Sequence, residues 1–191
     1  MTGIPFHRSP DLLHPESSSL VIIDLQTKLT PVIPQLDAVL ANCVKLLRGA
    51  ELLQVPCLAT EQYPKGLGPT IEQIAALIPE RREKLRFSAA EVLLQVPALI
   101  SPQRPQIVLA GIETHVCVLQ TALDLLAGGY EPFIVVDAVE SQHPRDREIA
   151  LQRLSAAGAR LVTTEMVLFE WCEIAGSDLF RQLSRIVTGR A

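Results

Sequence analysis

Cys117 stands at a point in the chain where a cysteine could act as a nucleophile. The apolar run 106–110 is typical of a buried strand, Gly111 follows it, and a helical pattern runs from Val118 to Leu126. At such a strand-to-helix turn, the partial positive charge of the helix N-terminus lowers the pKa of a thiol and favours the reactive thiolate. An isolated cysteine in apolar surroundings is, however, more often a structural core residue. The chemical interpretation of Cys117 therefore depends on partners elsewhere in the chain.

Two charged residues could be those partners. Asp24 lies near the end of an apolar strand predicted over 19–26, and open α/β sheets bind their ligands at the carboxyl ends of parallel strands. Lys84 precedes Leu85 and Phe87, whose alternation indicates a short edge strand that could direct the lysine inward. Both residues also have ordinary interpretations. Asp24 could cap the turn that follows it, and the charges around Lys84 could form a solvated surface.

An aspartate, a lysine and a cysteine are sufficient for acyl transfer through a thioester. The ammonium favours the thiolate, and the carboxylate can accept the thiol proton and return it to a leaving group. Backbone N–H groups of a tight turn can stabilise the oxyanion. The GxxxxGK[ST], GxGxxG and GxSxG motifs of nucleotide sites and serine hydrolases are absent. A Cys–His pair with His115 or His143 is conceivable, although His115 is only two residues from Cys117 on the same turn.

Strands and helices alternate along the chain, as short β-branched runs and helical apolar spacing indicate. We predict strands at 19–26, 56–60, 81–88, 106–110, 132–137 and 160–164, and helices at 37–54, 70–78, from about 89, 118–126, 144–157 and 178–186. The segment 61–70 contains glycine and proline and is expected to be a loop. The alternation indicates one α/β domain, 1–191, in which residues 1–17 form an irregular arm and residues 18–187 form the core.

The composition is that of an ordinary globular protein, with 48% apolar and 20% charged residues. A net charge of −4 and the lack of a basic cluster argue against nucleic acid and anionic membranes as partners. No signal sequence and no apolar run long enough to span a bilayer is found. The four cysteines lack the spacing of a disulfide framework or a zinc site. We therefore expect a reducing, cytoplasmic location.

Three stretches in this chain resemble the isochorismatase-like cysteine hydrolases. They are Ile22-Ile23-Asp24-Leu25-Gln26, Lys84 followed by Phe87-Ser88, and Gly-Ile-Glu-Thr-His-Val-Cys-Val at 111–118. The resemblance extends over about 18–186, and the loop 60–70 looks like that of the isochorismatase domain-containing proteins, a branch without a settled substrate. It implies a three-layer α/β/α fold with a six-stranded parallel sheet in the order 3-2-1-4-5-6.

The resemblance also implies roles for individual residues. It makes Asp24, Lys84 and Cys117 a catalytic triad, in which Asp24 is the general base and then the acid, Lys84 the electrostatic partner and Cys117 the nucleophile. It further implies a cis peptide bond between Ile112 and Glu113. The N–H groups of Glu113 and Cys117 would then form an oxyanion hole.

We place four further polar residues in the substrate pocket: Gln26, Gln62, Tyr63 and His115. No metal or other cofactor is expected. The nicotinamidase branch of the family binds its metal through an Asp-x-His and a further histidine after the second strand, where this chain has Glu61, Gln62 and Tyr63.

The favoured hypothesis is a metal-independent cysteine hydrolase that cleaves an amide-type C–N bond of a small molecule through a Cys117 thioester. The alternatives are vinyl ether hydrolysis of the isochorismatase type, in which Cys117 is dispensable, and a non-catalytic binding or scaffold protein that retains the fold. Since the family often forms closed assemblies, a homo-oligomer is expected, a dimer or tetramer. The apolar segment around Phe169, Trp171 and Phe180 could serve an interface or the core.

Overall fold

A six-stranded parallel sheet forms the centre of the molecule in a computed structural model that describes residues 7–189. Residues 1–6 of the predicted arm and residues 190–191 of the predicted domain lie outside the described residues. The strands follow the order β3-β2-β1-β4-β5-β6 across the sheet, which confirms the order that the resemblance implies. Their bounds are β1 Ser18–Ile23, β2 Cys57–Gln62, β3 Arg81–Lys84, β4 Gln106–Ile112, β5 Glu131–Glu140 and β6 Arg160–Val162.

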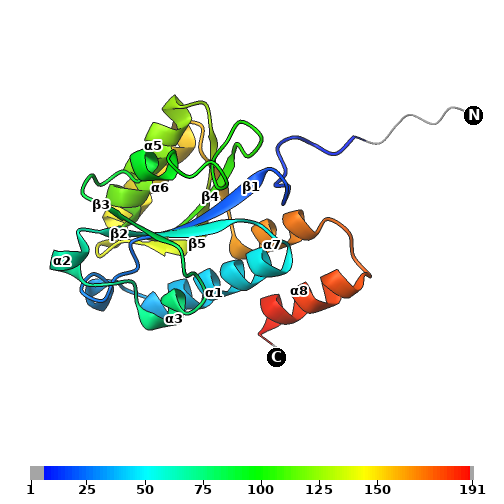
Figure 1. Ribbon diagram of the computed structural model, residues 1–191, viewed down its shortest axis with the longest axis horizontal. Helices are drawn as coiled ribbons and strands as arrows, with labels where there is room; N and C mark the ends of the chain where they lie inside the picture. Colours follow the sequence, from blue (N-terminus) through cyan, green and yellow to red (C-terminus); the bar gives the residue numbers. More distant parts are fainter. Residues whose placement is uncertain (1–6, 190–191) are drawn as a thin grey trace, which may run out of the picture.

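Helices cover both faces of the sheet and complete the predicted three-layer α/β/α fold (Figure 1). On one face lie α1 Leu36–Leu52, α3 Glu72–Ala75, α7 Thr164–Cys172 and α8 Asp178–Thr188. On the other lie α4 Ala90–Leu93, α5 Leu119–Ala127 and α6 Pro144–Ala156. Within residues 7–189, no helix is both long enough and apolar enough to cross a bilayer.

The strand β1 is a continuous apolar run because both of its faces are buried. Alternate side chains of a strand point to opposite faces. Leu20 and Ile22 accordingly pack in the layer with α1, whereas Val21 and Ile23 pack in the layer with α4 and α5. The two hydrophobic layers fix the sheet between them.

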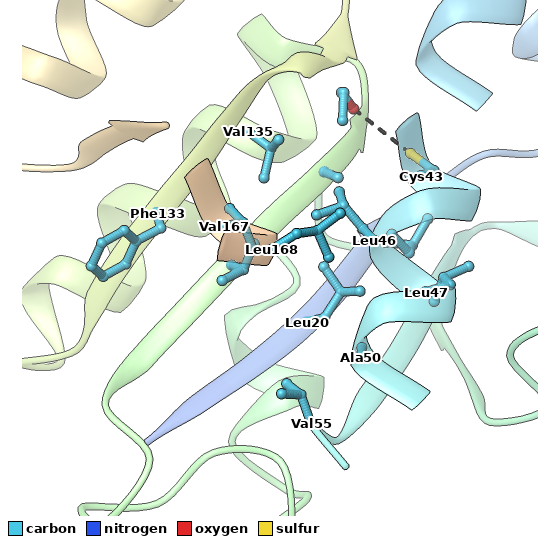
Figure 2. Packing of buried hydrophobic residues seen from close by; sticks show 14 of the residues in the cluster. Leu20, Cys43, Leu46, Leu47, Ala50, Val55, Phe133, Val135, Val167 and Leu168 are labelled. Atoms are coloured by element: carbon cyan, nitrogen blue, oxygen red, sulfur yellow. Dashed lines mark hydrogen bonds between the residues drawn. The ribbon is translucent and has the colours of Figure 1, made fainter. Parts of the chain in front are cut away.

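The helix α1 packs on the sheet through the apolar stripe that its sequence predicts. Cys43, Leu46, Leu47 and Ala50 are buried and face Leu20 of β1, with α7 beside them (Figure 2). The Cys43 thiol donates to the carbonyl of Ala138 in β5 at 3.8 Å. Cys43 is therefore a core residue.

The region after β2 is more regular than the predicted loop over 61–70. Glu61 and Gln62 continue β2, and Pro64–Leu67 form the single helical turn α2. Proline is well placed at the start of a helical turn, where its missing N–H is not needed. A Cβ at Gly66 would lie 2.3 Å from the Tyr63 ring, so this turn needs glycine to accommodate that ring.

The chain forms helix α7 in the short apolar segment around Phe169 and Trp171, for which no helix was predicted. The side chains that it buries have helical spacing: Thr164, Val167, Leu168, Trp171 and Cys172. Met166 and Phe169 of the same helix are also apolar, but they are exposed. Apolar residues therefore occur on both sides of α7, which hides its period in the sequence.

The strand order brings three chain segments to one edge of the sheet. β3 ends at Lys84, Asp24 follows β1, and the turn that carries Cys117 follows β4. β2 lies between β3 and β1, with Thr60 opposite Ile23 and Gln62 opposite Lys84. This edge is the carboxyl end of the parallel strands, where α/β sheets bind ligands.

Candidate active site

Asp24 is fully buried directly after β1. Its backbone is left-handed, with a φ of 49°, a conformation that aspartate adopts more readily than most residues. The Asp24 N–H donates to the Thr60 carbonyl at 3.2 Å, and the Thr60 hydroxyl donates to Asp24 Oδ1 at 2.6 Å. β2 therefore holds both the backbone and the carboxylate of Asp24.

Lys84 points into the protein from the end of β3, as the alternation around it predicted, and is only 4% exposed. Its Nζ lies 2.7 Å from Asp24 Oδ2 and donates to Gln62 Oε1 at 2.7 Å and to the Phe87 carbonyl at 2.9 Å. An ammonium removed from water needs such partners, because burying an unpaired charge is very costly. The lysine is thus held in one position by three acceptors.

Gly111 allows β4 to pass close to β1 just before the turn that carries Cys117. It has a φ of 113°, and a Cβ there would lie 2.1 Å from the carbonyl oxygen of Ile23. Only glycine combines this conformation with this close approach. The peptide bond between Ile112 and Glu113 is cis, at the position that the resemblance implies.

Cys117 lies in a π-helical turn, Thr114–Val118, that leads directly into α5. Its carbonyl accepts from the Thr121 hydroxyl at 2.6 Å. The same hydroxyl oxygen accepts from the Ala89 N–H at 2.8 Å. The start of α4 and the turn of the candidate nucleophile are therefore tied together through one threonine.

The structure brings together the three residues that the sequence analysis selected. Lys84 Nζ lies 2.7 Å from Asp24 Oδ2 and 3.5 Å from Cys117 Sγ. Cys117 is only 6% exposed, so all three groups are largely out of water. A carboxylate, an ammonium and a thiol in contact are able to exchange a proton and stabilise charge around a reacting carbon.

Burial raises the pKa of Cys117 from 9.0 to about 12, and the negative charge of Asp24 adds to this rise, while the positive charge of Lys84 opposes it. The expectation of a lowered thiol pKa is therefore wrong. Desolvation of the thiolate outweighs the favourable effect of the lysine. A reaction at this thiol would need a base to take its proton, and Asp24 is the carboxylate in this site.

Two residues expected in the substrate pocket use their amides within the protein instead. The Gln26 amide donates to the carbonyls of Gln62 and Gly68, at 3.0 and 2.6 Å, and accepts from the Gln62 N–H at 2.7 Å. The Gln62 amide accepts from Lys84 Nζ and donates to the Leu85 carbonyl at 2.8 Å. In this structure Gln26 supports the end of β2, and Gln62 supports Lys84.

The other two residues expected in the pocket lie on different sides of the site. Tyr63 is 51% exposed and lines a cavity of about 350 Å³ together with Lys84 and Leu85. His115 makes its contacts on the side of α6, where its Nδ1 lies 3.0 Å from Ser141 Oγ. Its Nε2 is 3.8 Å from the Asp146 carboxylate. Tyr63 is therefore the one of these two that borders an opening next to Lys84.

Glu61, within β2, occupies a position at which the resemblance implies a metal ligand in the nicotinamidase branch. Its Oε1 accepts from the N–H and the hydroxyl of Thr70, each at 2.7 Å. Because side chains alternate along a strand, Glu61 points to the face of β2 opposite to that of Thr60 and Gln62. Across the described part of the chain, no group of three or more His, Cys, Asp or Glu side chains is arranged to hold a metal ion.

Comparison with known protein families gives a match over the whole of this site. A family model described as the Isochorismatase domain matches residues 18–166, which include Asp24, Lys84 and Cys117. The chain belongs to the isochorismatase family. The family resemblance seen in the sequence is thereby confirmed.

Relatives in the isochorismatase family align over most of the chain. Isochorismatase domain-containing protein 2A of Mus musculus is 39% identical over 178 residues, or 91% of this chain and 84% of the mouse protein. MAR1 ribonuclease from Caenorhabditis elegans has a TM-score of 0.84 at 32% identity and 94% coverage of both chains. The YcaC gene product of Escherichia coli, described as an octameric hydrolase of unknown specificity, has a TM-score of 0.82, with 96% and 98% coverage. At 24% identity, the likeness to YcaC concerns the fold alone.

Thr60 is a residue of this isochorismatase site that sequence reasoning missed. The sequence places it in a buried strand, but its contact with Asp24 depends on the register between β1 and β2. The available signal was the polar pair Thr60 and Gln62, two positions apart at the carboxyl end of a strand. Such spacing puts both side chains on one face.

Proposed function

We propose that this chain is a metal-independent cysteine hydrolase that cleaves an amide-type C–N bond of a small molecule. The observation that carries the proposal is the contact of Lys84 Nζ with Asp24 Oδ2 at 2.7 Å and with Cys117 Sγ at 3.5 Å. Acyl transfer through a thioester needs a nucleophile, a base and a cation, and here the cation contacts both of the other groups. No cofactor takes part in the steps below.

In acylation, Cys117 Sγ attacks the substrate carbonyl carbon, and the thiol proton passes to the Asp24 carboxylate. Because the raised pKa keeps the thiol neutral at pH 7, its proton leaves as the C–S bond forms. When the tetrahedral intermediate collapses, the C–N bond breaks and Asp24 returns the proton to the leaving nitrogen. The products are the free amine and a Cys117 thioester, while Lys84 balances the negative charge of the site.

In deacylation, water attacks the thioester carbonyl carbon and gives a proton to Asp24. The C–S bond then breaks, the sulfur regains a proton and the carboxylic acid leaves. We assign the oxyanion hole of both steps to the backbone N–H groups of Glu113 and Cys117. The ordered turn supports this assignment, since the Val116 and Val118 N–H groups both donate to the Glu113 carbonyl, at 3.1 and 3.2 Å.

We propose a small molecule as the substrate, although the relative from Caenorhabditis elegans is described as a ribonuclease. A cavity of about 350 Å³ lies next to the site, lined by Tyr63 and Lys84 but by neither Asp24 nor Cys117, and its volume suits a small ligand. The net charge of −4 gives the chain no excess of cations for phosphates.

We further propose a cytoplasmic homo-oligomer, a dimer or tetramer. All four cysteines are free, as in a reducing compartment. Leu85 and Phe87, next to Lys84, are large apolar side chains that are 78% and 53% exposed, and such surface is commonly covered by another subunit. YcaC, which shares the fold, is described as octameric.

Vinyl ether hydrolysis of the isochorismatase type is the second candidate function. Asp24 and Lys84 are in contact with each other without any participation of the sulfur. A reaction that needs only this pair as acid, base and charge stabiliser is compatible with the same site. In that reaction Cys117 would be dispensable.

The test is turnover of a panel of small amides and esters, together with isochorismate, by the wild type, Cys117→Ala and Asp24→Asn. The proposal predicts turnover of at least one amide that both substitutions abolish. Amide turnover that survives in Cys117→Ala would contradict the thioester route. Isochorismate turnover that persists in Cys117→Ala and is lost in Asp24→Asn would favour the vinyl ether reaction. Binding of a panel compound without turnover would favour a non-catalytic role.

A further inference from the structure

The strand β2 carries none of Asp24, Lys84 and Cys117, yet it lies between β1, which ends just before Asp24, and β3, which ends with Lys84. The sheet order is β3-β2-β1, Thr60 is opposite Ile23, and Gln62 is opposite Lys84. Side chains at positions i and i+2 of a strand share a face. The end of β2 can therefore reach the base on one side and the lysine on the other.

Thr60 uses its hydroxyl to hold one oxygen of the Asp24 carboxylate. The hydroxyl donates to Oδ1 at 2.6 Å, and both residues are fully buried. Lys84 Nζ lies 2.7 Å from the other oxygen, Oδ2. With Oδ1 occupied by Thr60, the carboxylate cannot rotate without breaking a buried hydrogen bond. Oδ2 is thereby kept on the side of Lys84, whose Nζ also contacts Cys117 Sγ at 3.5 Å.

Gln62 holds the Lys84 ammonium in a similar way. Its Oε1 accepts from Nζ at 2.7 Å, and its Nε2 donates to the Leu85 carbonyl at 2.8 Å. The amide therefore cannot turn without losing one of two partners. The Gln62 N–H is in turn held by Gln26 Oε1 at 2.7 Å. The lysine ammonium is consequently directed between Asp24 and Cys117.

We propose that Thr60 and Gln62 are positioning residues of this site, which select the oxygen of Asp24 that exchanges the proton and fix Lys84 beside it. The inference rests on the proposed function and deepens it. In this inference, side chains of β2 align the base Asp24 and the cation Lys84. Gln62 then holds Lys84 in place and does not bind the substrate.

The test for Thr60 uses the rate at which iodoacetamide alkylates Cys117, because this reaction needs no knowledge of the substrate. Thr60→Val keeps the shape of the side chain and removes the hydroxyl, whereas Thr60→Ser keeps the hydroxyl. Loss of a hydrogen bond to the charged carboxylate favours its protonated form, so a higher pH is needed before Asp24 is deprotonated and able to accept the thiol proton. In Thr60→Val, we expect the alkylation rate to rise at a pH roughly one unit higher than in the wild type. Thr60→Ser should restore the wild-type profile.

The groups that face this reaction are Asp24, Lys84 and Cys117, with Thr60 and Gln62 behind them. Rates are measured from pH 5 to pH 9 by mass spectrometry of the peptides, and unchanged slow labelling of the fully buried Cys43 shows that each variant is folded. A Thr60→Val profile that coincides with the wild type overturns the role of Thr60. So does a Thr60→Ser profile that shifts as far as that of Thr60→Val.

Asp24→Asn separates failure of this inference from failure of the proposed function. If Asp24→Asn slows the alkylation of Cys117 while Thr60→Val does not, Asp24 is the base and only the positioning role is wrong. If Asp24→Asn also leaves the profile unchanged, Asp24 is not the base, and the proposed mechanism fails with it.

Gln62→Met tests the second half of the inference. The substitution keeps a side chain of similar length and removes the acceptor for Lys84 Nζ. We expect Cys117 alkylation at pH 7 to fall about tenfold, because a misplaced ammonium no longer stabilises the developing thiolate. An unchanged alkylation rate would overturn the positioning role and return Gln62 to the substrate pocket.

Discussion

At the scale of single residues, two opposite charges are held 2.7 Å apart, with side-chain exposures of 2% for Lys84 and 0% for Asp24. Removal of one partner leaves the other as an unpaired buried charge, which typically costs roughly 3–5 kcal/mol. We predict that Lys84→Met lowers the free energy of unfolding by about this amount. The double variant with Asp24→Asn should lose much less than the sum of the single losses. Urea unfolding of the wild type, the two single variants and the double variant measures the coupling between Lys84 and Asp24. Losses that simply add in the double variant would contradict this coupling.

The sequence was sufficient to select Asp24, Lys84 and Cys117, because each stands at the end of a strand or the start of a helix. It was not sufficient for the direction of the Cys117 pKa shift. Desolvation depends on how many atoms surround the sulfur, and these atoms come from segments far apart in the chain. The contacts of Gln26 and Gln62 were hidden for the same reason, since each depends on the register of neighbouring strands.

At the scale of elements, the close approach of β4 to β1 positions the turn that carries Cys117 at the site. A Cβ at Gly111 would lie 2.1 Å from the Ile23 carbonyl oxygen and 2.6 Å from the Ile23 nitrogen. We predict that Gly111→Ala lowers the free energy of unfolding by more than about 3 kcal/mol, because backbone must move in the middle of the sheet. Chemical denaturation measures the loss.

Gly129→Ala is the matched control for Gly111→Ala. Gly129 also has a positive φ, 80°, but a Cβ there meets nothing within 4 Å. Gly129→Ala should lower the free energy of unfolding only by the cost of holding alanine in a left-handed conformation, about 1–2 kcal/mol. Equal losses in the two variants would show that the close approach of β4 to β1 is unimportant.

The central elements were predictable because their apolar runs or stripes are uninterrupted. The helices α2 and α7 were not. A run containing Pro64 and Gly66 is typical of a loop, and the single turn there depends on packing of the Tyr63 ring over glycine. In α7 the exposed Met166 and Phe169 fill the gaps in the apolar pattern. The sequence therefore indicates an apolar segment without indicating a helix.

At the scale of the whole molecule, alternation of strands and helices predicted a parallel sheet but did not determine the order of its strands. That order came from the family resemblance, and the structure has it. The order matters for the proposed function, since the arrangement β3-β2-β1-β4 brings Lys84, Asp24 and Cys117 to neighbouring strand ends, with β2 between Lys84 and Asp24.

The buried thiols predict how the stability of the whole molecule depends on pH. Burial raises the pKa of Cys43 from 9.0 to about 12, and the charge of Asp137 adds to the rise. The folded protein keeps this thiol neutral while the unfolded chain ionises it above pH 9, so its contribution is present below pH 9 and is lost as the pH rises towards 12. Between pH 8 and pH 10 the loss is about 1.4 kcal/mol.

Cys43→Ala isolates that contribution. The free energy of unfolding of the variant should fall less between pH 8 and pH 10 than that of the wild type, by about 1.4 kcal/mol. The cavity that the substitution leaves destabilises the variant equally at both pH values. It therefore does not affect the difference between pH 8 and pH 10, which is the quantity compared with the wild type. Parallel losses in urea unfolding would show that Cys43 does not carry the effect.

The central claim, that Asp24 takes the proton of Cys117, is tested most directly by comparison of two cysteines in the same chain. Cys57 also has a pKa raised to about 12, and it is more exposed than Cys117. The measurement is the rate of iodoacetamide labelling of each at pH 7, in the wild type and in Asp24→Asn. We predict that wild-type Cys117 reacts at least about tenfold faster than Cys57 and that Asp24→Asn abolishes this advantage. Faster labelling of Cys57 in the wild type, or an unchanged Cys117 rate in Asp24→Asn, would contradict the account.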